Sequence, residues 1–496
     1  MLSSNRLIFT ILIVFISLSA RSFSLAQYQG RGSGHAWRAE AATRITQHRK
    51  ADLNVTAKLS DGSVLSDANI EISMQRHQFK FGSAVDARYM LDSQALYNSQ
   101  YAEKIKDLFN AAVYENHMKW RPWAGNWGSA FDQSVTQEGL TWLNENDIDV
   151  RGHAMLWTRR QSVANHVQEL LDITNPTQQD LQDLYDASFA HINDIGSAVK
   201  GKVFAWDMLN ESRTSHDIED KLIGFTPAGG AEITNRTDLR HQWFQAANAV
   251  DPEAKLFLND FSILPGGDFS STNARTSHRA ILDDLIAAGT PVEGIGFQSH
   301  FKQPDDPNDP SDPNYTKQLT GIPKLIEMLD AFEADYNLPV HITEYDYDID
   351  TSVDSNRFLQ KDYTRDFLTA MFSHESVDAF LFWGFWEGKM SNPNAALFDL
   401  NFDPTLNGNQ YLDLVFNQWW TEEMGLTDAF GTFGTRGFKG DYLIKVDYDG
   451  KTYEFDAVLG DGGLDFDAVI GVPEPSGILL TAILVSCPWG WRRRRG

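Results

Sequence analysis

The sequence predicts an α/β fold, a (β/α)8 or TIM barrel with small β-rich segments at its N- and C-terminal ends. Eight short apolar runs occur between residues 79 and 384, with helical or loop-like segments between them. Polar or ionisable residues follow nearly every run, and the carboxyl ends of the strands in such a barrel meet at one rim. The chain of 496 residues exceeds the roughly 250 residues that one barrel needs, which leaves room for additions at both ends.

The eight apolar runs have the length of buried strands in a parallel sheet. They cover residues 79–84, 110–115, 149–156, 203–209, 255–259, 294–298, 339–343 and 379–384. Helical patterns at 178–192 and 322–336 occupy two of the gaps, and a Pro-rich acidic loop at 305–315 occupies another. We therefore expect the catalytic barrel to span residues 77–420.

The first 26 residues have the pattern of an export signal. A basic residue, Arg6, precedes an apolar run at 7–18, and Ser24 and Ala26 place small side chains where a signal peptidase reads the chain. The sequence therefore predicts a signal peptide over residues 1–26. The alternative is a retained membrane anchor.

Residues 27–76 are expected to form a linker with a short helix, followed by a β-hairpin. Apolar residues alternate in period two along 52–59 and again along 68–73. Asp61-Gly62 lies between these segments and is typical of a tight turn.

The segment 421–470 predicts a second small β-rich part. Two alternating runs, 441–447 and 451–456, flank Asp449-Gly450, which is another hairpin signal. One hypothesis is that this C-terminal appendage packs with the N-terminal hairpin.

The last segment, 471–496, resembles the PEP-CTERM sorting tail of bacterial exported proteins. Pro473-Glu474-Pro475 is followed by an apolar stretch at 476–491 and then by four arginines. The arginines would stay on the cytoplasmic side while the apolar stretch holds the chain in the membrane. We therefore expect an exported protein of the cell surface or the extracellular space. An anchor that is never processed is the alternative.

Charge and motif content exclude several classes of function. The net charge of −26 argues against a nucleic-acid partner, which requires clustered Lys and Arg. The sequence contains no metal-ligand spacing, phosphate loop or Gly-x-Ser-x-Gly elbow, so it predicts neither a metal nor a cofactor. The only cysteine, Cys487, lies in the tail, so the exported body is expected to contain no disulfide. A monomer is expected.

Two glutamates follow different predicted strands and are the candidate catalytic pair. Glu211 ends the run that begins at Val203, and Glu344 ends the run that contains Val340. Hydrolysis of a glycosidic bond uses two carboxyl groups, one to protonate the leaving oxygen and one to attack or to activate water.

The segments around these glutamates resemble glycoside hydrolase family 10, the endo-β-1,4-xylanases. Residues 206–211 (WDMLNE) are similar to the acid/base signature of that family, and residues 342–346 (ITEYD) are similar to its nucleophile signature. Further similar blocks are 115–120 (ENHMKW), 151–153 (RGH) with Trp157, 259–260 (ND), 296–300 (GFQSH) and 382–384 (FWG). Residues 81–84, 110–113 and 383–388 resemble the plant-type branch.

The resemblance implies a retaining endo-β-1,4-xylanase that binds xylan, with Glu211 as acid/base and Glu344 as nucleophile. The other residues that it implies for substrate binding and support are Glu115, Asn116, Lys119, His153, Trp157, Asn210, Gln298, His300, Asp346 and Trp383. His300 would orient the nucleophile with Asp346 behind it, and Trp157 and Trp383 would stack on sugar rings. Core packing is the alternative role for each tryptophan.

Two departures from the family pattern affect the sugar subsites. The family often has His-Ser-Gln after the residue aligned with Trp157, whereas this chain has Thr158-Arg159-Arg160-Gln161. A second stacking tryptophan is replaced by Ser391, and Trp386 is a candidate to compensate for it. Two alternatives therefore stay open: the same mechanism on another β-glycan, and a catalytically weak surface protein that binds glycans.

Overall fold

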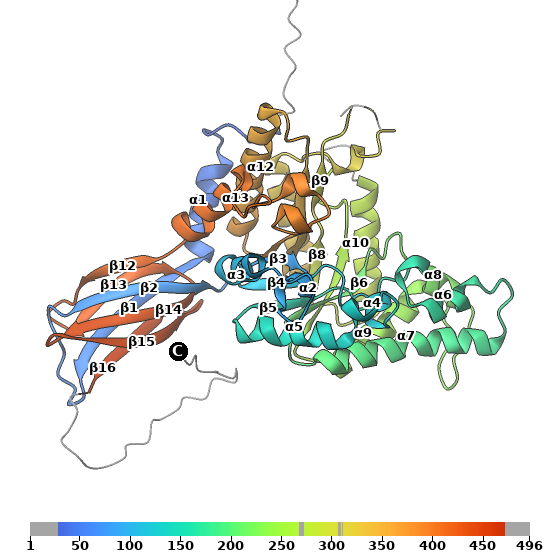
Figure 1. Cartoon of the computed structure of the whole chain (residues 1–496), viewed down its shortest axis with the longest axis horizontal. Helices are drawn as coiled ribbons and strands as arrows, with labels where there is room; N and C mark the ends of the chain where they lie inside the picture. Colours follow the sequence, from blue (N-terminus) through green and yellow to red (C-terminus); the bar gives the residue numbers. More distant parts are fainter. Residues whose placement is uncertain (1–27, 267–271, 306–308, 310, 472–496) are drawn as a thin grey trace, which may run out of the picture. The chain divides into compact units, whose positions relative to one another are not determined.

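The computed structural model describes residues 28–266, 272–305, 309 and 311–471, and these form two compact units (Figure 1). One unit contains residues 28–48 and 80–417, and the other contains residues 49–79 and 418–471. The predicted signal peptide and the predicted sorting tail beyond Gly471 lie outside the described residues. None of the described helices combines the length and the apolar character of a membrane span.

The first unit is built on a closed barrel of eight parallel strands, which confirms the predicted fold class. The strands follow the order β11-β3-β4-β5-β6-β7-β8-β10, and pairing of β10 with β11 closes the barrel. Each of the eight apolar runs contributes one strand. The strands are β3 Lys80–Val85, β4 Ala111–Tyr114, β5 Asp149–Gly152, β6 Ala205–Asn210, β7 Lys255–Asp260, β8 Gly294–Phe297, β10 Val340–Asp348 and β11 Val377–Phe382. A short strand, β9 (His300–Lys302), extends the sheet beside the end of β10.

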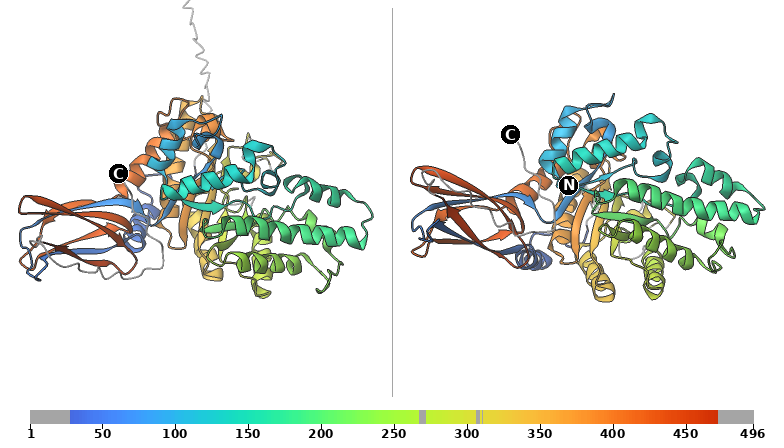
Figure 2. Two further views of the ribbon diagram at one scale, coloured as in Figure 1. Left: turned by 60° about the horizontal axis from the view of Figure 1, so that its bottom comes forward. Right: turned by 90° about the horizontal axis from the view of Figure 1, so that it is seen from below.

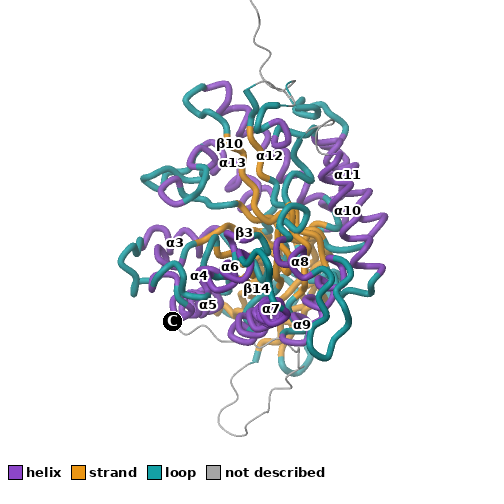
Figure 3. Tube along the Cα trace, turned by 90° about the vertical axis from the view of Figure 1, so that its right-hand side faces the viewer, coloured by secondary structure: helices purple, strands orange, loops and turns teal. Residues whose placement is uncertain are grey.

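Helices surround the barrel, as Figure 3 shows for the purple segments around the orange strands. The longer helices are α1 Trp37–His48, α3 Ser99–Leu108, α5 Gln133–Glu145, α6 Asn165–Asp172, α7 Gln178–Val199, α9 Arg236–Val250, α10 Thr272–Ala287, α11 Ile322–Tyr336, α12 Asp354–Ser373 and α13 Leu406–Asp413. Shorter ones are α2 Ala87–Met90, α4 Trp120–Trp123 and α8 Asp217–Leu222. The predicted helices at 178–192 and 322–336 are both present, and α7 extends beyond its predicted end to Val199.

The second unit consists of two β-sheets that combine the early and late parts of the chain. Both views in Figure 2 show its blue and red strands side by side. One sheet has the order β13-β1-β16 and the other has the order β12-β2-β14-β15. Their bounds are β1 Lys50–Leu59, β2 Asn69–His77, β12 Glu422–Leu426, β13 Thr432–Phe438, β14 Gly440–Tyr448, β15 Lys451–Leu459 and β16 Leu464–Ile470. The hypothesis that the C-terminal appendage packs with the N-terminal strands agrees with this arrangement.

The predicted N-terminal hairpin is wrong, because β1 and β2 enter different sheets. The turn at Asp61-Gly62 does form, since the Gly62 amide donates to the Leu59 carbonyl, but pairing across it stops at a single bridge between Lys58 and Val64. Each strand instead pairs with late segments of the chain: β1 with β13 and β16, and β2 with β12 and β14. The alternating pattern correctly indicated one buried face for each strand, but it could not indicate the partner strands.

The predicted C-terminal hairpin is present. Strands β14 and β15 pair antiparallel from Gly440–Leu459 to Tyr448–Lys451. The turn residues Asp449 and Gly450 both have positive φ, of 50° and 72°. Positive φ at both central residues is what a two-residue type I′ turn requires, and it explains the Asp-Gly pair at this position.

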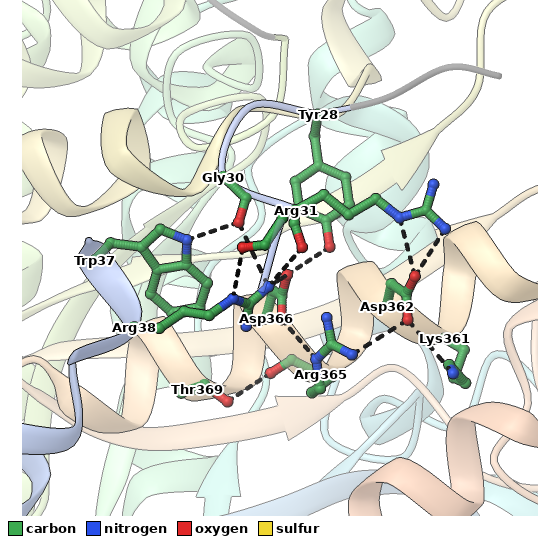
Figure 4. Close-up of polar contacts among 11 residues, drawn as sticks. Tyr28, Gly30, Arg31, Trp37, Arg38, Lys361, Asp362, Arg365, Asp366 and Thr369 are labelled. Carbon is green, nitrogen blue, oxygen red and sulfur yellow. Dashed lines mark hydrogen bonds and ion pairs between the residues drawn. The ribbon is translucent and has the colours of Figure 1, made fainter. Parts of the chain in front are cut away.

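The segment that precedes α1 is tied to helix α12 by a buried carboxylate (Figure 4). The side chain of Asp366 is fully buried, and it accepts hydrogen bonds from the Tyr28 hydroxyl at 2.7 Å, from Arg38 at 2.6 and 2.7 Å and from Arg365 at 2.7 Å. Arg31 makes a further ion pair with Asp362 at 2.7 Å. These contacts hold residues 28–48, which belong to the barrel unit, against helix α12.

Replacing Asp366 with alanine should lower the free energy of unfolding by about 3 to 5 kcal/mol, because it leaves a buried cluster of cations without its counter-charge. Urea unfolding followed by circular dichroism measures this change. Asp354→Ala on the same helix is the control, since Asp354 is 87% exposed and should cost only about 0 to 1 kcal/mol. Equal losses in the two variants would contradict the role given to Asp366.

Candidate active site

Side chains from the carboxyl ends of the barrel strands surround a cavity of about 360 Å³. The barrel topology explains their meeting, because all eight strands point their carboxyl ends toward the same rim. The cavity is lined by Lys119, His153, Trp157, Asn210, Glu211, Phe261, Ser262, Gln298, His300, Lys317, Glu344 and Trp383. Nine of the twelve residues predicted for the site line this cavity; Glu115, Asn116 and Asp346 do not.

Glu211 lies directly after β6 in a strained backbone conformation. Its φ is 54°, a value that non-glycine residues rarely adopt, and its amide donates to the carbonyl of Asn259 at 2.8 Å. Burial raises the pKa of Glu211, the charge of Glu344 adds to that rise, and a hydrogen bond from Gln298 at 3.2 Å partly offsets it. Glu211 is therefore the carboxyl group of the pair that keeps its proton to higher pH.

Glu344 lies within β10, and its neighbours stabilise its negative charge. Asn259 donates to one carboxylate oxygen at 3.1 Å, and His300 contacts the other oxygen at 3.0 Å. Burial alone would raise the pKa of Glu344. The hydrogen bond from His300 and the electrostatic effects of His153 and His300 outweigh burial, so the pKa lies below its usual value. The two cavity carboxyls thus have pKa values shifted in opposite directions.

His300 connects the nucleophile candidate to a second carboxylate. Its Nδ1 lies 3.0 Å from Asp346, and Asn392 donates to the other Asp346 oxygen at 2.6 Å. Burial lowers the pKa of His300, but Asp346 and Glu344 outweigh this effect and raise it to about 10. The ring is therefore a cation at neutral pH, and it donates one N–H to Glu344 and the other to Asp346.

His153 belongs to a buried network with Asp207 and Arg151. The Nδ1 atom of His153 lies 2.8 Å from Asp207, which also binds the guanidinium of Arg151. Burial would raise the pKa of Asp207, but Arg151 and His153 outweigh it and lower the pKa. One nitrogen of His153 and one carboxylate oxygen each of Asp207 and Glu344 lie within 4.8 Å of one another, as metal ligands would. The carboxylates of Asp207 and Glu344 already contact Arg151, His300 and Asn259, so these cations and hydrogen-bond donors balance their charge.

Asn210 is oriented by two other amides. Its side-chain oxygen accepts from Asn259 at 3.0 Å and from Gln298 at 3.3 Å. The amide NH₂ group is consequently the part of Asn210 that can donate to a bound sugar.

The two predicted stacking tryptophans line the cavity, and each also packs on protein. Trp383 is 8% exposed and belongs to a core cluster with Ala84, Val113, Ala379 and Leu381. The guanidinium of Arg159 lies 3.8 Å from the ring of Trp157, whose indole N–H donates to Ser215 at 3.1 Å. Packing on protein is thus present at both rings, and stacking on a sugar stays a prediction.

Glu115 and Asn116 do not line the cavity, and each contacts a lysine. Lys389 forms an ion pair with Glu115, and the Ser391 hydroxyl donates to Glu115 at 3.3 Å. Asn116 accepts a hydrogen bond from the cavity residue Lys119 at 3.2 Å, and burial lowers the pKa of Lys119.

The suggestion that Trp386 replaces the tryptophan expected at Ser391 is not supported. The Trp386 ring stacks on Phe402 with centroids 4.7 Å apart, and it does not line the cavity.

Sequence reasoning missed several residues of the site. Asn259 belongs to the segment 259–260 that resembles the family. Its hydrogen bonds to Asn210 and Glu344, however, depend on the register of three strands. The contacts of Lys389 and Asn392 with Glu115 and Asp346 depend on the loop after β11. Phe261, Ser262 and Lys317 also line the cavity and were not predicted. Phe261 and Ser262 follow Asp260 at the end of β7, so their position after a strand could have indicated them.

A barrel rim with one buried and one half-buried carboxyl group of opposite pKa shift, beside aromatic walls, defines a site of the glycoside hydrolase class. Comparison with known families agrees with this assignment. Residues 70–412 match the model described as glycosyl hydrolase family 10. The chain belongs to this family.

The chain is also similar to curated proteins and to solved structures. The anti-sigma-I factor RsgI6 of Acetivibrio thermocellus is 29% identical over 453 residues, which cover 89% of this chain and 51% of that protein. Endo-1,4-beta-xylanase 1 of Arabidopsis thaliana is 27% identical over 400 residues, which cover 80% of this chain and 36% of that protein. The chain thus spans about half or less of the length of these relatives.

The fold is shared with xylanase 10B from Thermotoga petrophila RKU-1 in complex with xylobiose, with a TM-score of 0.52 and 22% identity over 69% of this chain and 95% of that chain. Native xylanase 10B from Thermotoga maritima gives the same TM-score and identity, and covers 69% of this chain and 96% of that chain.

The raised pKa of His300 predicts an imidazolium that persists above neutral pH. Nitrogen NMR of the ring should show both nitrogens protonated at pH 8, and Asp346→Asn should lower the pKa because it removes the largest favourable charge. Since the folded pKa is raised, the stability that this group contributes is complete below the unfolded pKa of about 6.5 and is lost as pH rises through about 10. A neutral ring at pH 8 in the unmodified protein would contradict this electrostatic account.

Proposed function

We propose that the protein is a retaining endo-β-1,4-xylanase that hydrolyses internal linkages of xylan, with Glu211 as acid/base and Glu344 as nucleophile. The observation that carries this proposal is that one cavity contains both carboxyls and shifts their pKa values apart. A general acid must hold its proton at working pH, whereas a nucleophile must be ionised.

The reaction proceeds in two displacements. Glu211 gives its proton to the glycosidic oxygen while a carboxylate oxygen of Glu344 attacks the anomeric carbon, so the bond to the leaving sugar breaks as the bond to Glu344 forms. Glu211, now ionised, takes a proton from water, and the water oxygen attacks the same carbon and releases Glu344. His300 and Asn259 hold the carboxylate in place for both steps.

Xylan is the substrate that the relatives support best, because several are named endo-1,4-beta-xylanases. The sequence resemblance to the plant-type branch supports the same substrate. Another β-glycan stays an alternative, because Ser391 stands where a stacking tryptophan was expected and contacts Glu115 instead of offering a ring face. A glycan-binding protein without catalysis is less well supported, since both carboxyls and their hydrogen-bond partners are present.

We further propose that the protein acts as an exported monomer at the cell surface or outside the cell. The export pattern at 1–26 and the PEP-CTERM-like pattern at 471–496 support this location. In this view the tail contacts the membrane and its sorting machinery only transiently.

Alanine at each glutamate should give a distinct kinetic result. Glu211→Ala should lower the rate on xylan by about 10²- to 10⁴-fold, and much less on an aryl xylobioside whose leaving group needs no proton. Glu344→Ala should abolish hydrolysis of both substrates. Added azide should rescue the first variant with a β-glycosyl azide, formed after two inversions, and the second with an α-glycosyl azide, formed after one.

The assay should compare xylan, β-glucan and cellulose, with Glu145→Ala, an exposed glutamate on α5, as a control that keeps full activity. Hydrolysis of xylan by Glu344→Ala at the native rate would contradict the mechanism. Native activity on β-glucan but not on xylan would instead keep the mechanism and overturn the substrate.

A further inference from the structure

A second group of metal-ligating side chains lies at the opposite end of the barrel from the cavity. It consists of His48, Asp330, Glu333, His374 and Glu375, which we call the helix-end cluster. His48 ends α1, Asp330 and Glu333 lie one turn apart on α11, and His374 follows α12. Because His374 and Glu375 directly precede β11, the helix-end cluster lies where the strands begin, whereas the cavity lies where they end.

The spacing of the donor atoms in the helix-end cluster suits a small cation. The Nε2 atom of His374 lies 3.0 Å from a carboxylate oxygen of Asp330 and 3.9 Å from one of Glu333. These three residues each offer one ligand atom, and the atoms lie within 4.8 Å of one another. Ligand atoms at about 2.0 to 2.1 Å from a tetrahedral zinc ion are roughly 3.3 Å apart. The observed separations lie on both sides of that value.

Two carboxyl groups of the cluster influence each other electrostatically. Burial and the neighbouring carboxyl group of Glu375 raise the pKa of Glu333 to about 7. Neighbouring carboxylates repel unless a proton or a cation lies between them. A divalent cation held by His374, Asp330 and Glu333 would therefore also reduce the repulsion from Glu375.

Further hydrogen bonds hold the ligand groups in place. The Ser376 hydroxyl lies 2.9 Å from Nδ1 of His374, so the ring is fixed with Nε2 toward the carboxylates. The Nδ1 atom of His48 lies 3.0 Å from Glu375. The side chain of His374 is only 3% exposed, whereas those of Asp330 and Glu375 are 66% and 54% exposed. Ligands held by such outer contacts are typical of metal sites, and the exposed side gives an ion access.

We propose that His374, Asp330 and Glu333 form a binding site for a divalent cation of the zinc type, with Glu375 beside it. The imidazole ligand favours Zn²⁺ over Ca²⁺ and Mg²⁺, which prefer oxygen ligands. A bound ion joins α11 to the end of α12, and to α1 through His48, so it stabilises the fold at a distance from the cavity. The sequence predicted no metal because the ligands come from separate segments with no signature spacing.

Zinc binding to the purified protein tests this proposal. After EDTA treatment and dialysis, isothermal titration calorimetry measures the affinity for Zn²⁺, and thermal unfolding measures the midpoint with and without Zn²⁺. The unmodified protein should bind Zn²⁺, and the midpoint should rise with Zn²⁺ because a ligand that binds only the folded state stabilises it. The double variant Asp330→Asn, Glu333→Gln should bind at least about tenfold more weakly and lose most of the rise in midpoint.

Two controls make the result specific. Glu327→Gln changes a glutamate of α11 that is 69% exposed and pairs with Lys324, and it should bind Zn²⁺ like the unmodified protein. Glu344→Ala removes a member of the other His and carboxylate group, formed with His153 and Asp207, and should also leave Zn²⁺ binding unchanged. The proposal is overturned if the unmodified protein does not bind Zn²⁺, if the double variant binds as tightly, or if Glu344→Ala abolishes binding.

Discussion

The buried charge of Glu344 is the constraint on which the rest of the site depends. A carboxylate removed from water is costly unless hydrogen bonds and opposite charges replace its hydration. Asn259, His300 and His153 supply them here, and Asp346 in turn keeps His300 protonated. At Glu211, burial and the charge of Glu344 outweigh the hydrogen bond from Gln298 and the charge of Arg159, so the pKa rises. One cavity thus contains two carboxyl groups whose pKa values are shifted in opposite directions.

The barrel brings these groups together from distant parts of the chain. Asn259 and Glu344 are 85 residues apart, and each lies near the carboxyl end of a parallel strand. Residues 28–48 strengthen the same unit through Asp366, a buried carboxylate that is also surrounded by cations. In the sequence the barrel is inserted between β2 and β12, two paired strands of the β-rich unit. The same rule applies at both carboxylates: a buried charge persists because several donors share it.

Local patterns in the sequence were sufficient to predict the barrel strands and the position of Glu211 and Glu344 at the cavity. Apolar runs of strand length indicated all eight barrel strands, and residues at their ends indicated the two glutamates. Patterns could not indicate which strands would cover the alternating faces of β1 and β2, because pairing with residues about 400 positions away has no local signal. The ion pair of Lys389 with Glu115 and the helix-end cluster were missed for the same reason, since loop and helix ends set their geometry.

Covalent trapping tests the central claim most directly, because it identifies the group that attacks the sugar. A xylobioside with fluorine at C2 and a good leaving group forms its glycosyl-enzyme faster than the intermediate is hydrolysed. Peptide mass spectrometry of the inactivated protein should place the sugar on Glu344. Label on Glu211 or on any other residue, or full inactivation without covalent label, would contradict the assignment of the buried ionised carboxylate as nucleophile.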